Sequence, residues 1–213
     1  MSPLDSLRSP FMRRDWVRVK AGVATAIPAH SVVLITASTI TNGEIVYTVR
    51  QPNAASTDFN WSGYLITGPF AIDASTSYEG IATDASTPAL ASYDTGSPAL
   101  KEVWGPKHSQ FTLSKNYYGF EVVGSTTTSA GINVVPVRWI GIGTVLGKID
   151  NSSVSVGSSC TVSVWAGAGG SEGDTTMNIT GVYNRGTSLT SLSSPYCMVS
   201  RNGGVPYLIW VAC

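Results

Sequence analysis

Short apolar runs and alternating apolar positions recur along most of this chain, and both patterns are typical of β-strands. Residues 16–20 and 160–165 alternate apolar and polar side chains, as strands with one buried face do. Residues 31–36 form a short apolar run, and residues 207–211 are apolar on both faces, so we expect the chain to end inside a domain. The pair Asn42-Gly43 is typical of a tight hairpin turn. No segment has the 3.6-residue period of a helix.

Turn residues separate the strand signals about every ten positions, a spacing typical of sandwiches, barrels and jelly rolls. The sequence therefore predicts an all-β fold made of antiparallel jelly-roll, barrel-like or sandwich units. Residues 124–131 contain no apolar side chain larger than Ala and mark the expected junction. We expect a β domain over residues 16–124, a C-terminal β domain over 132–213, and an extended N-terminal arm over 1–15.

The first twenty residues differ in charge from the rest of the chain. They hold five of the 13 Lys and Arg but two of the 13 Asp and Glu, which leaves 8 basic and 11 acidic residues in the remainder. Pro3 and Pro10 favour extended backbone, and single apolar residues lie around them. We expect this arm to bind a partner surface. The residues expected to make the contact are Leu7, Arg8, Phe11, Met12, Arg13, Arg14 and Trp16.

Composition excludes several classes of function. Charged residues make up 12% of the chain, about half the usual ~25%, whereas 50 of 213 residues are Ser or Thr. The net charge is zero, so the molecule as a whole has no general attraction for nucleic acid. No apolar stretch reaches the ~18 residues of a membrane-spanning helix. We therefore expect neither direct nucleic-acid binding nor a membrane partner.

Candidate catalytic and metal-binding residues are few. Cys160, Cys197 and Cys213 lack Cys-x-x-Cys spacing, so we expect buried thiols, and a bond between Cys160 and Cys197 stays open. His30 and His108 have no neighbouring nucleophile or carboxylate at a useful spacing, and we interpret both as surface or turn histidines. The sequence thus predicts no catalytic residue, no metal site and no cofactor. The six Trp are expected to anchor cores, with sugar stacking as the alternative.

Several short segments between residues 16 and 213 carry a family resemblance. They are Val-Arg-Val (17–19), Ala-Ile-Pro-Ala-His-Ser-Val-Val (26–33), Val-Trp-Gly-Pro-Lys (103–107), Phe-Thr-Leu (111–113), Gly-Phe-Glu-Val-Val-Gly (119–124), Leu-Gly-Lys (146–148), Gly-Ser-Ser-Cys-Thr-Val-Ser-Val-Trp (157–165), Val-Tyr-Asn-Arg (182–185) and Tyr-Leu-Ile (207–209). In this order the segments resemble uncharacterised virion structural proteins of tailed bacteriophages, of the capsid decoration (cement) or head-fibre type. Other members have Ala-Ala-Glu-Cys near the end, where this chain has Ile-Trp-Val-Ala-Cys.

The resemblance implies a phage structural protein and leaves open which part of the virion it belongs to. A compact β body with an extended arm can clamp neighbouring shell subunits, so we expect a place on the outside of the capsid, with assembly in the host cytoplasm. The expected function is decoration: the protein would bind the major capsid protein shell through its arm and self-associate as a homotrimer. One alternative is a tail- or head-fibre module that recognises host surface polysaccharide, and another is a neck or tail subunit. Decoration predicts tryptophans buried in cores, whereas recognition predicts a solvent-facing aromatic patch.

Overall fold

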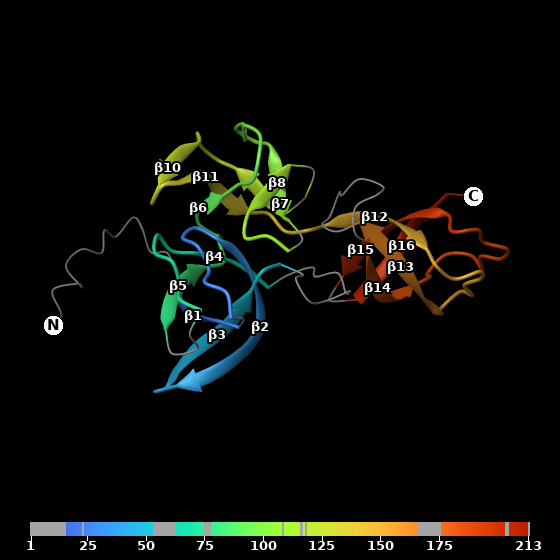
Figure 1. Cartoon of the computed structure of the whole chain (residues 1–213). Coiled ribbons are helices and arrows are strands. Elements are labelled where there is room, and N and C mark those ends of the chain that lie inside the picture. The colour runs from blue at the N-terminus through green and yellow to red at the C-terminus, as the bar shows by residue number, and fades with distance from the viewer. Residues whose placement is uncertain are drawn as a thin grey trace.

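The computed structural model describes residues 16–22, 24–52, 63–74, 78–107, 109–115, 117, 119–165, 176–202 and 205–212. Over these residues the fold is all-β, with sixteen strands and no helix (Figure 1). The predicted all-β, barrel-like architecture is therefore confirmed. The expected arm over residues 1–15 lies outside the described residues.

The first unit is a closed five-stranded barrel. Its strands are β1 (Val17–Ala21), β2 (Val32–Thr41), β3 (Glu44–Arg50), β4 (Tyr64–Thr67) and β5 (Glu79–Thr83). They are ordered β1-β3-β2-β4-β5, and β5 pairs again with β1. All neighbours are antiparallel except β1 and β3, which are parallel. Closure leaves this sheet without a free edge strand.

The second unit is a partly closed, six-stranded sheet. Its strands are β6 (Ala89–Ser92), β7 (Val103–Pro106), β8 (Leu113–Lys115), β9 (Phe120–Val122), β10 (Thr127–Ser129) and β11 (Ile132–Trp139). They are ordered β10-β11-β9-β7-β8, and β6 pairs with β11. A parallel bridge between Tyr93 and Leu113 connects the end of β6 to β8.

The second unit repeats the topology of the first. With the Tyr93–Leu113 bridge included, β6, β7, β8, β9 and β11 have the same neighbours as β1 to β5, and in both units the first strand runs parallel to the third. A tight turn with a positive φ at its third residue precedes the second strand of each unit, at His30 (57°) and Lys101 (69°). The amides of these two residues donate to the end of the fourth strand, at 2.9 and 2.8 Å.

One hydrophobic core joins the two units, because the first three residues of β2 and all of β4 are buried on both faces. Val33 and Leu65 point into the first barrel. The alternate residues on the same strands point outward and pack on the second unit. These are Val32 and Leu34 of β2 and Tyr64 and Ile66 of β4, which cluster with Trp104, Leu113, Phe120, Val122 and Val137. Full burial of each such side chain contributes about 1.5–3 kcal/mol, so this shared layer is a major source of stability.

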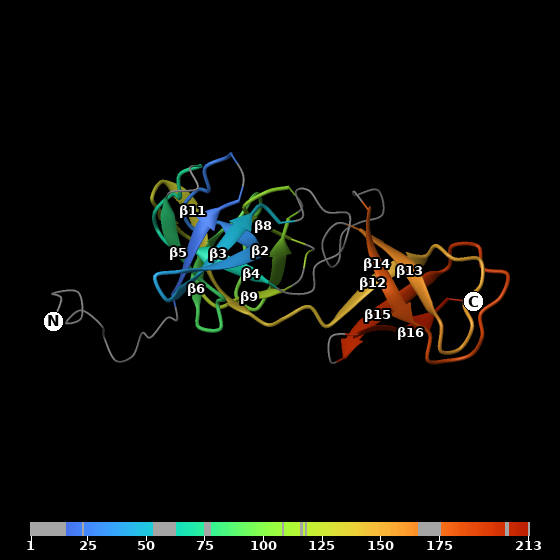
Figure 2. The same cartoon turned by 90° about the horizontal axis from the view of Figure 1, so that it is seen from below.

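The third unit is a closed barrel with a core of its own. Its strands are β12 (Thr144–Ile149), β13 (Ser159–Trp165), β14 (Thr176–Tyr183), β15 (Tyr196–Asn202) and β16 (Val205–Val211). The order is β12-β13-β14-β16-β15, with β14 parallel to β16 and β12 closing on β15. Counted from β14 onward, this is a circular permutation of the first barrel. Figures 1 and 2 show the barrel at one end of the molecule.

The change from one sheet to the next falls at residues 140–143, and not at the junction that the sequence predicts near 124–131. β10 and β11 form a hairpin, and β11 also pairs with β6 and β9, so residues 127–139 belong to the second unit. The lack of large apolar side chains in residues 124–131 predicted a junction, but part of this segment is the strand β10. That strand is largely exposed and needs no large apolar side chains. Between the units, Ile142 packs against both the second core and the third.

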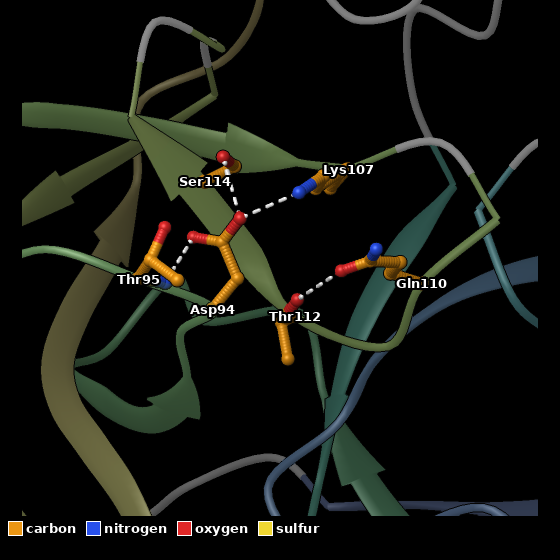
Figure 3. A network of polar contacts seen from close by, with 6 residues as sticks. All are labelled: Asp94, Thr95, Lys107, Gln110, Thr112 and Ser114. Carbon is orange, nitrogen blue, oxygen red and sulfur yellow. Dashed lines mark hydrogen bonds and ion pairs between the residues drawn. The ribbon is translucent and has the colours of Figure 1, made fainter.

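Two carboxylates fasten the β7–β8 hairpin within the second unit. Asp94 accepts hydrogen bonds from Lys107 Nζ (2.8 Å), Ser114 Oγ (2.9 Å) and the Thr95 amide (2.6 Å), as Figure 3 shows. Burial opposes ionisation of Asp94, but these donors hold its pKa below the ordinary value.

Glu102 is the second carboxylate in this region whose pKa is lowered. It accepts hydrogen bonds from Trp104 Nε1, the Ala99 amide and Lys115 Nζ, each at 3.0 Å. These bonds, that of Trp104 first, lower the pKa of Glu102 to about 2. The bond from Trp104 also satisfies the indole N–H of a side chain that is otherwise fully buried.

Acid is therefore expected to destabilise the protein through these carboxylates. A carboxylate whose pKa is lowered by folding stabilises the native state above its unfolded pKa and loses that contribution as pH falls. The free energy of unfolding should decrease as pH falls from about 4.5 toward 2, the interval between the ordinary and folded pKa of Glu102. Urea unfolding at several pH values, followed by tryptophan fluorescence, measures this.

Two variants separate this effect from general acid instability. Glu102→Gln should be less stable than wild type at pH 6 and should show a flatter dependence on pH below 4.5. Thr112→Val is the control, because it removes a nearby bond to Gln110 (3.3 Å) that involves no titratable group. An unchanged pH dependence in Glu102→Gln would contradict the assignment.

Candidate binding surfaces

The structure places one of the seven predicted contact residues. Trp16 lies directly before β1, and its side chain is 37% exposed. The other six lie outside the described residues and have no structural account. They are Leu7, Arg8, Phe11, Met12, Arg13 and Arg14.

Trp16 borders a pocket of about 170 Å³. The other lining residues are His30, Thr67, Gly68, Pro69, Ala89, Leu90 and Ser129, which come from the first and second units. A neighbouring pocket of about 420 Å³ shares Gly68 and is lined by the exposed side chains of Phe70 and Ile81. The chain thus enters the first barrel beside an apolar surface.

His30 connects the first two units. It occupies a turn, as predicted, but its side chain is buried and not on the surface. Its Nε2 lies 2.8 Å from Ser129 Oγ on β10, and its carbonyl accepts a hydrogen bond (2.8 Å) from the Ser92 amide on β6. A base beside a hydroxyl is one part of a nucleophilic site, which also needs an orienting group and oxyanion donors. We interpret the contacts described here as structural, because they join two sheets.

The remaining candidates for chemistry give no site within the described residues. Cys160 and Cys197 are buried and free, which confirms the predicted thiols. Burial first, and nearby negative charge second, raise the pKa of Cys160 to about 11 and that of Cys197 to about 12, so neither is a reactive thiolate at neutral pH. No cluster of three or more His, Cys, Asp or Glu in the described part could hold a metal. His108 and Cys213 lie outside it.

The tryptophans divide between cores and surface. Trp104 is fully buried, and Trp139 packs edge-to-face on Phe120 with ring centroids 4.8 Å apart, so these two confirm the expected core role. Trp16 and Trp210 do not, because both are substantially exposed. Residues 207–211 belong to β16 of the third barrel, as expected, but the exposure of Trp210 shows that this strand is not buried on both faces.

Trp210 belongs to a row of exposed apolar side chains across the third barrel. Leu146 on β12 lies opposite Met198 on β15, and Met198 lies opposite Trp210 on β16. Their exposed fractions are 47%, 37% and 49%. Two cation–π pairs flank the row. They are Lys148 over Tyr196 (4.7 Å to the ring centroid) and Arg185 over Tyr207 (4.9 Å).

These seven residues are called the C-terminal face below. The face contains two cations and no carboxylate. Among the described residues of this barrel Asp150 is the one acidic side chain, and it accepts a hydrogen bond from Ser163 on β13. Sequence reasoning missed the face, because an alternating strand does not show which of its two sides lies inside a barrel.

Comparisons with known protein families, curated proteins and solved structures found no match. Within the described residues no helix is long and apolar enough to cross a membrane. Two surfaces are candidates for binding a partner, the apolar surface beside Trp16 and the C-terminal face.

A structural role for the His30–Ser129 contact predicts a modest effect on stability. Ser129→Ala should lower the free energy of unfolding by about 1 kcal/mol, the usual net value of one hydrogen bond. Thr128→Ala is the matched control, since Thr128 is an exposed neighbour on the same strand. Urea unfolding measures both. Labelling of Ser129 by a fluorophosphonate, which reacts with activated serines, would show instead that the pair is catalytic.

Proposed function

We propose that this protein is a virion structural protein of a tailed bacteriophage, and specifically a decoration protein on the outer surface of the capsid. The observation that supports this most strongly is the separation of charge along the chain. In the described body, Arg18, Lys107, Lys115 and Arg138 pair with carboxylates of their own units. The segment ahead of residue 16 carries Arg8, Arg13 and Arg14 against two acidic residues. A body close to neutral, with 10 basic and 11 acidic residues after residue 15, behind a basic and apolar lead-in is suited to attachment to another protein.

The body has the properties that a clamp on a shell requires. Closed barrels offer few strand edges for uncontrolled association, and the shared core makes the first two units one block. The arginines of the arm would bind carboxylates of the major capsid protein, in bidentate pairs that fix register as well as adding energy. Trp16 would set the direction in which the arm leaves the body. Self-association around a three-fold axis would place several arms on neighbouring shell subunits.

A second candidate function is supported by the exposed aromatic residues. Trp210 and Trp16 present indole rings to solvent, as expected of a fibre module that stacks on host polysaccharide. Such a module would be present in few copies per particle, whereas the copy number of a decoration protein rises with the number of shell subunits. Binding to isolated host polysaccharide, lost on Trp210→Ala, would favour this alternative.

Deletion of residues 1–15 tests the proposed attachment. Because the arm carries the expected anchors, the truncated body should bind particles that lack the protein at least tenfold more weakly than the full chain. Loss of a desolvated arginine contact costs about 2–5 kcal/mol, whereas exposed pairs contribute less than ~1 kcal/mol. Co-sedimentation with the particles over a range of protein concentrations measures the affinity.

The control for the deletion is a full chain with Arg8, Arg13 and Arg14 replaced by Gln, which keeps the length and apolar residues of the arm. We expect it to bind more weakly than wild type and to lose most of the salt dependence of binding. Equal affinity of the full and truncated chains would show that the arm is not the tether.

A further inference from the structure

The C-terminal face has an apolar strip along its centre. Single exposed apolar residues are common on protein surfaces and need no explanation. Here Leu146, Met198 and Trp210 are cross-strand neighbours on three adjacent strands, so their side chains form one continuous strip. Continuous apolar strips rimmed by polar groups are typical of sites that are covered by a partner.

The residue types favour a protein over a sugar as the partner. Leu146 and Met198 offer neither a flat ring for stacking nor a hydrogen-bond donor, and they occupy two of the three positions in the strip. Trp, Tyr, Met and Arg are the residues enriched in the central parts of protein–protein interfaces. The face therefore resembles an interface core with a basic rim.

The charge of the face specifies the chemistry of the partner. Arg185 lies over Tyr207, and among the described residues it forms no ion pair with a carboxylate. Lys148 adds a second positive charge beside Tyr196 on the other flank of the strip. The one described carboxylate of the barrel, Asp150, accepts a hydrogen bond from Ser163, which lies opposite Lys148 in the sheet, so negative charge is already present on that flank. A matching surface would present an apolar patch with Asp or Glu on the side that meets Arg185.

We infer that the C-terminal face docks on a second protein through an apolar patch with carboxylates on the side that meets Arg185. This inference rests on the proposed function, under which that protein is the major capsid protein. The protein then attaches at two points, through its arm and through the third barrel. Two linked contacts raise the overall affinity well above that of either one.

The experiment compares three full-length proteins on particles that lack the protein. In one, Leu146→Ser, Met198→Ser and Trp210→Ser remove the strip. The matched control is Ile40→Ser with Ile45→Ser, which removes an even more exposed apolar cross-strand pair (78% and 53%) from the β2–β3 hairpin. We expect at least a tenfold loss of affinity for the strip variant and no change for the control.

Arg185→Glu gives an independent test that does not depend on the folding of the strip variant. Arg185 lies outside the strands, so its replacement should leave the barrel intact. It should weaken binding about five- to tenfold and reduce the dependence of affinity on salt. Cys160 and Cys197 lie in the core of the third barrel, so their protection from thiol reagents shows that this core is intact in each variant.

The outcomes distinguish the two proposals. If wild type binds the particles and both face variants bind equally well, the inference is overturned while the decoration function stands. If wild type does not bind, the proposed function fails, and the docking inference fails with it. If the strip variant changes only the oligomeric mass in light scattering, the face joins copies of this chain, which also overturns the inference.

Discussion

Burial of the start of β2 and of all of β4 on both faces is the constraint on which the first two-thirds of the molecule depend. Their alternate side chains fill two different cores, Val33 and Leu65 on one side and Leu34 and Ile66 on the other. A polar residue at any of these positions would leave an unsatisfied group in one core or the other. The two units therefore cannot separate without exposing a shared apolar layer, so they present their surfaces as one block.

The three units are variations on one arrangement of five strands. The first two have the same order and the same parallel pair, and the third is a circular permutation of it. Each barrel needs only short strands, which suits a chain rich in turn residues and poor in long apolar segments. The third barrel has a core of its own, and among the described residues only Ile142 packs against both this core and the second, so the barrel can carry a contact surface of its own.

The sequence predicted local structure better than the placement of surfaces. Asn42-Gly43 forms the expected hairpin turn, with positive φ at both residues, because that conformation is favourable for this pair. The repeated strand order of the three units could not be predicted, because the units share a topology without sharing a sequence pattern. The exposed Trp210 could not be predicted either, since strand periodicity shows that two faces exist but not which one closes around the core. For the arm, sequence remains the sole source, because six of its seven predicted contact residues lie outside the described part.

Copy number per virion tests the decoration proposal most directly. A protein that clamps the shell must be present in proportion to the major capsid protein, whereas a fibre tip or a neck subunit occupies only a few positions. Quantitative mass spectrometry of purified particles, with isotope-labelled peptides from both proteins, gives this ratio. We expect a fixed stoichiometry relative to the shell subunits, with hundreds of copies per particle. A handful of copies, independent of the size of the shell, would contradict it.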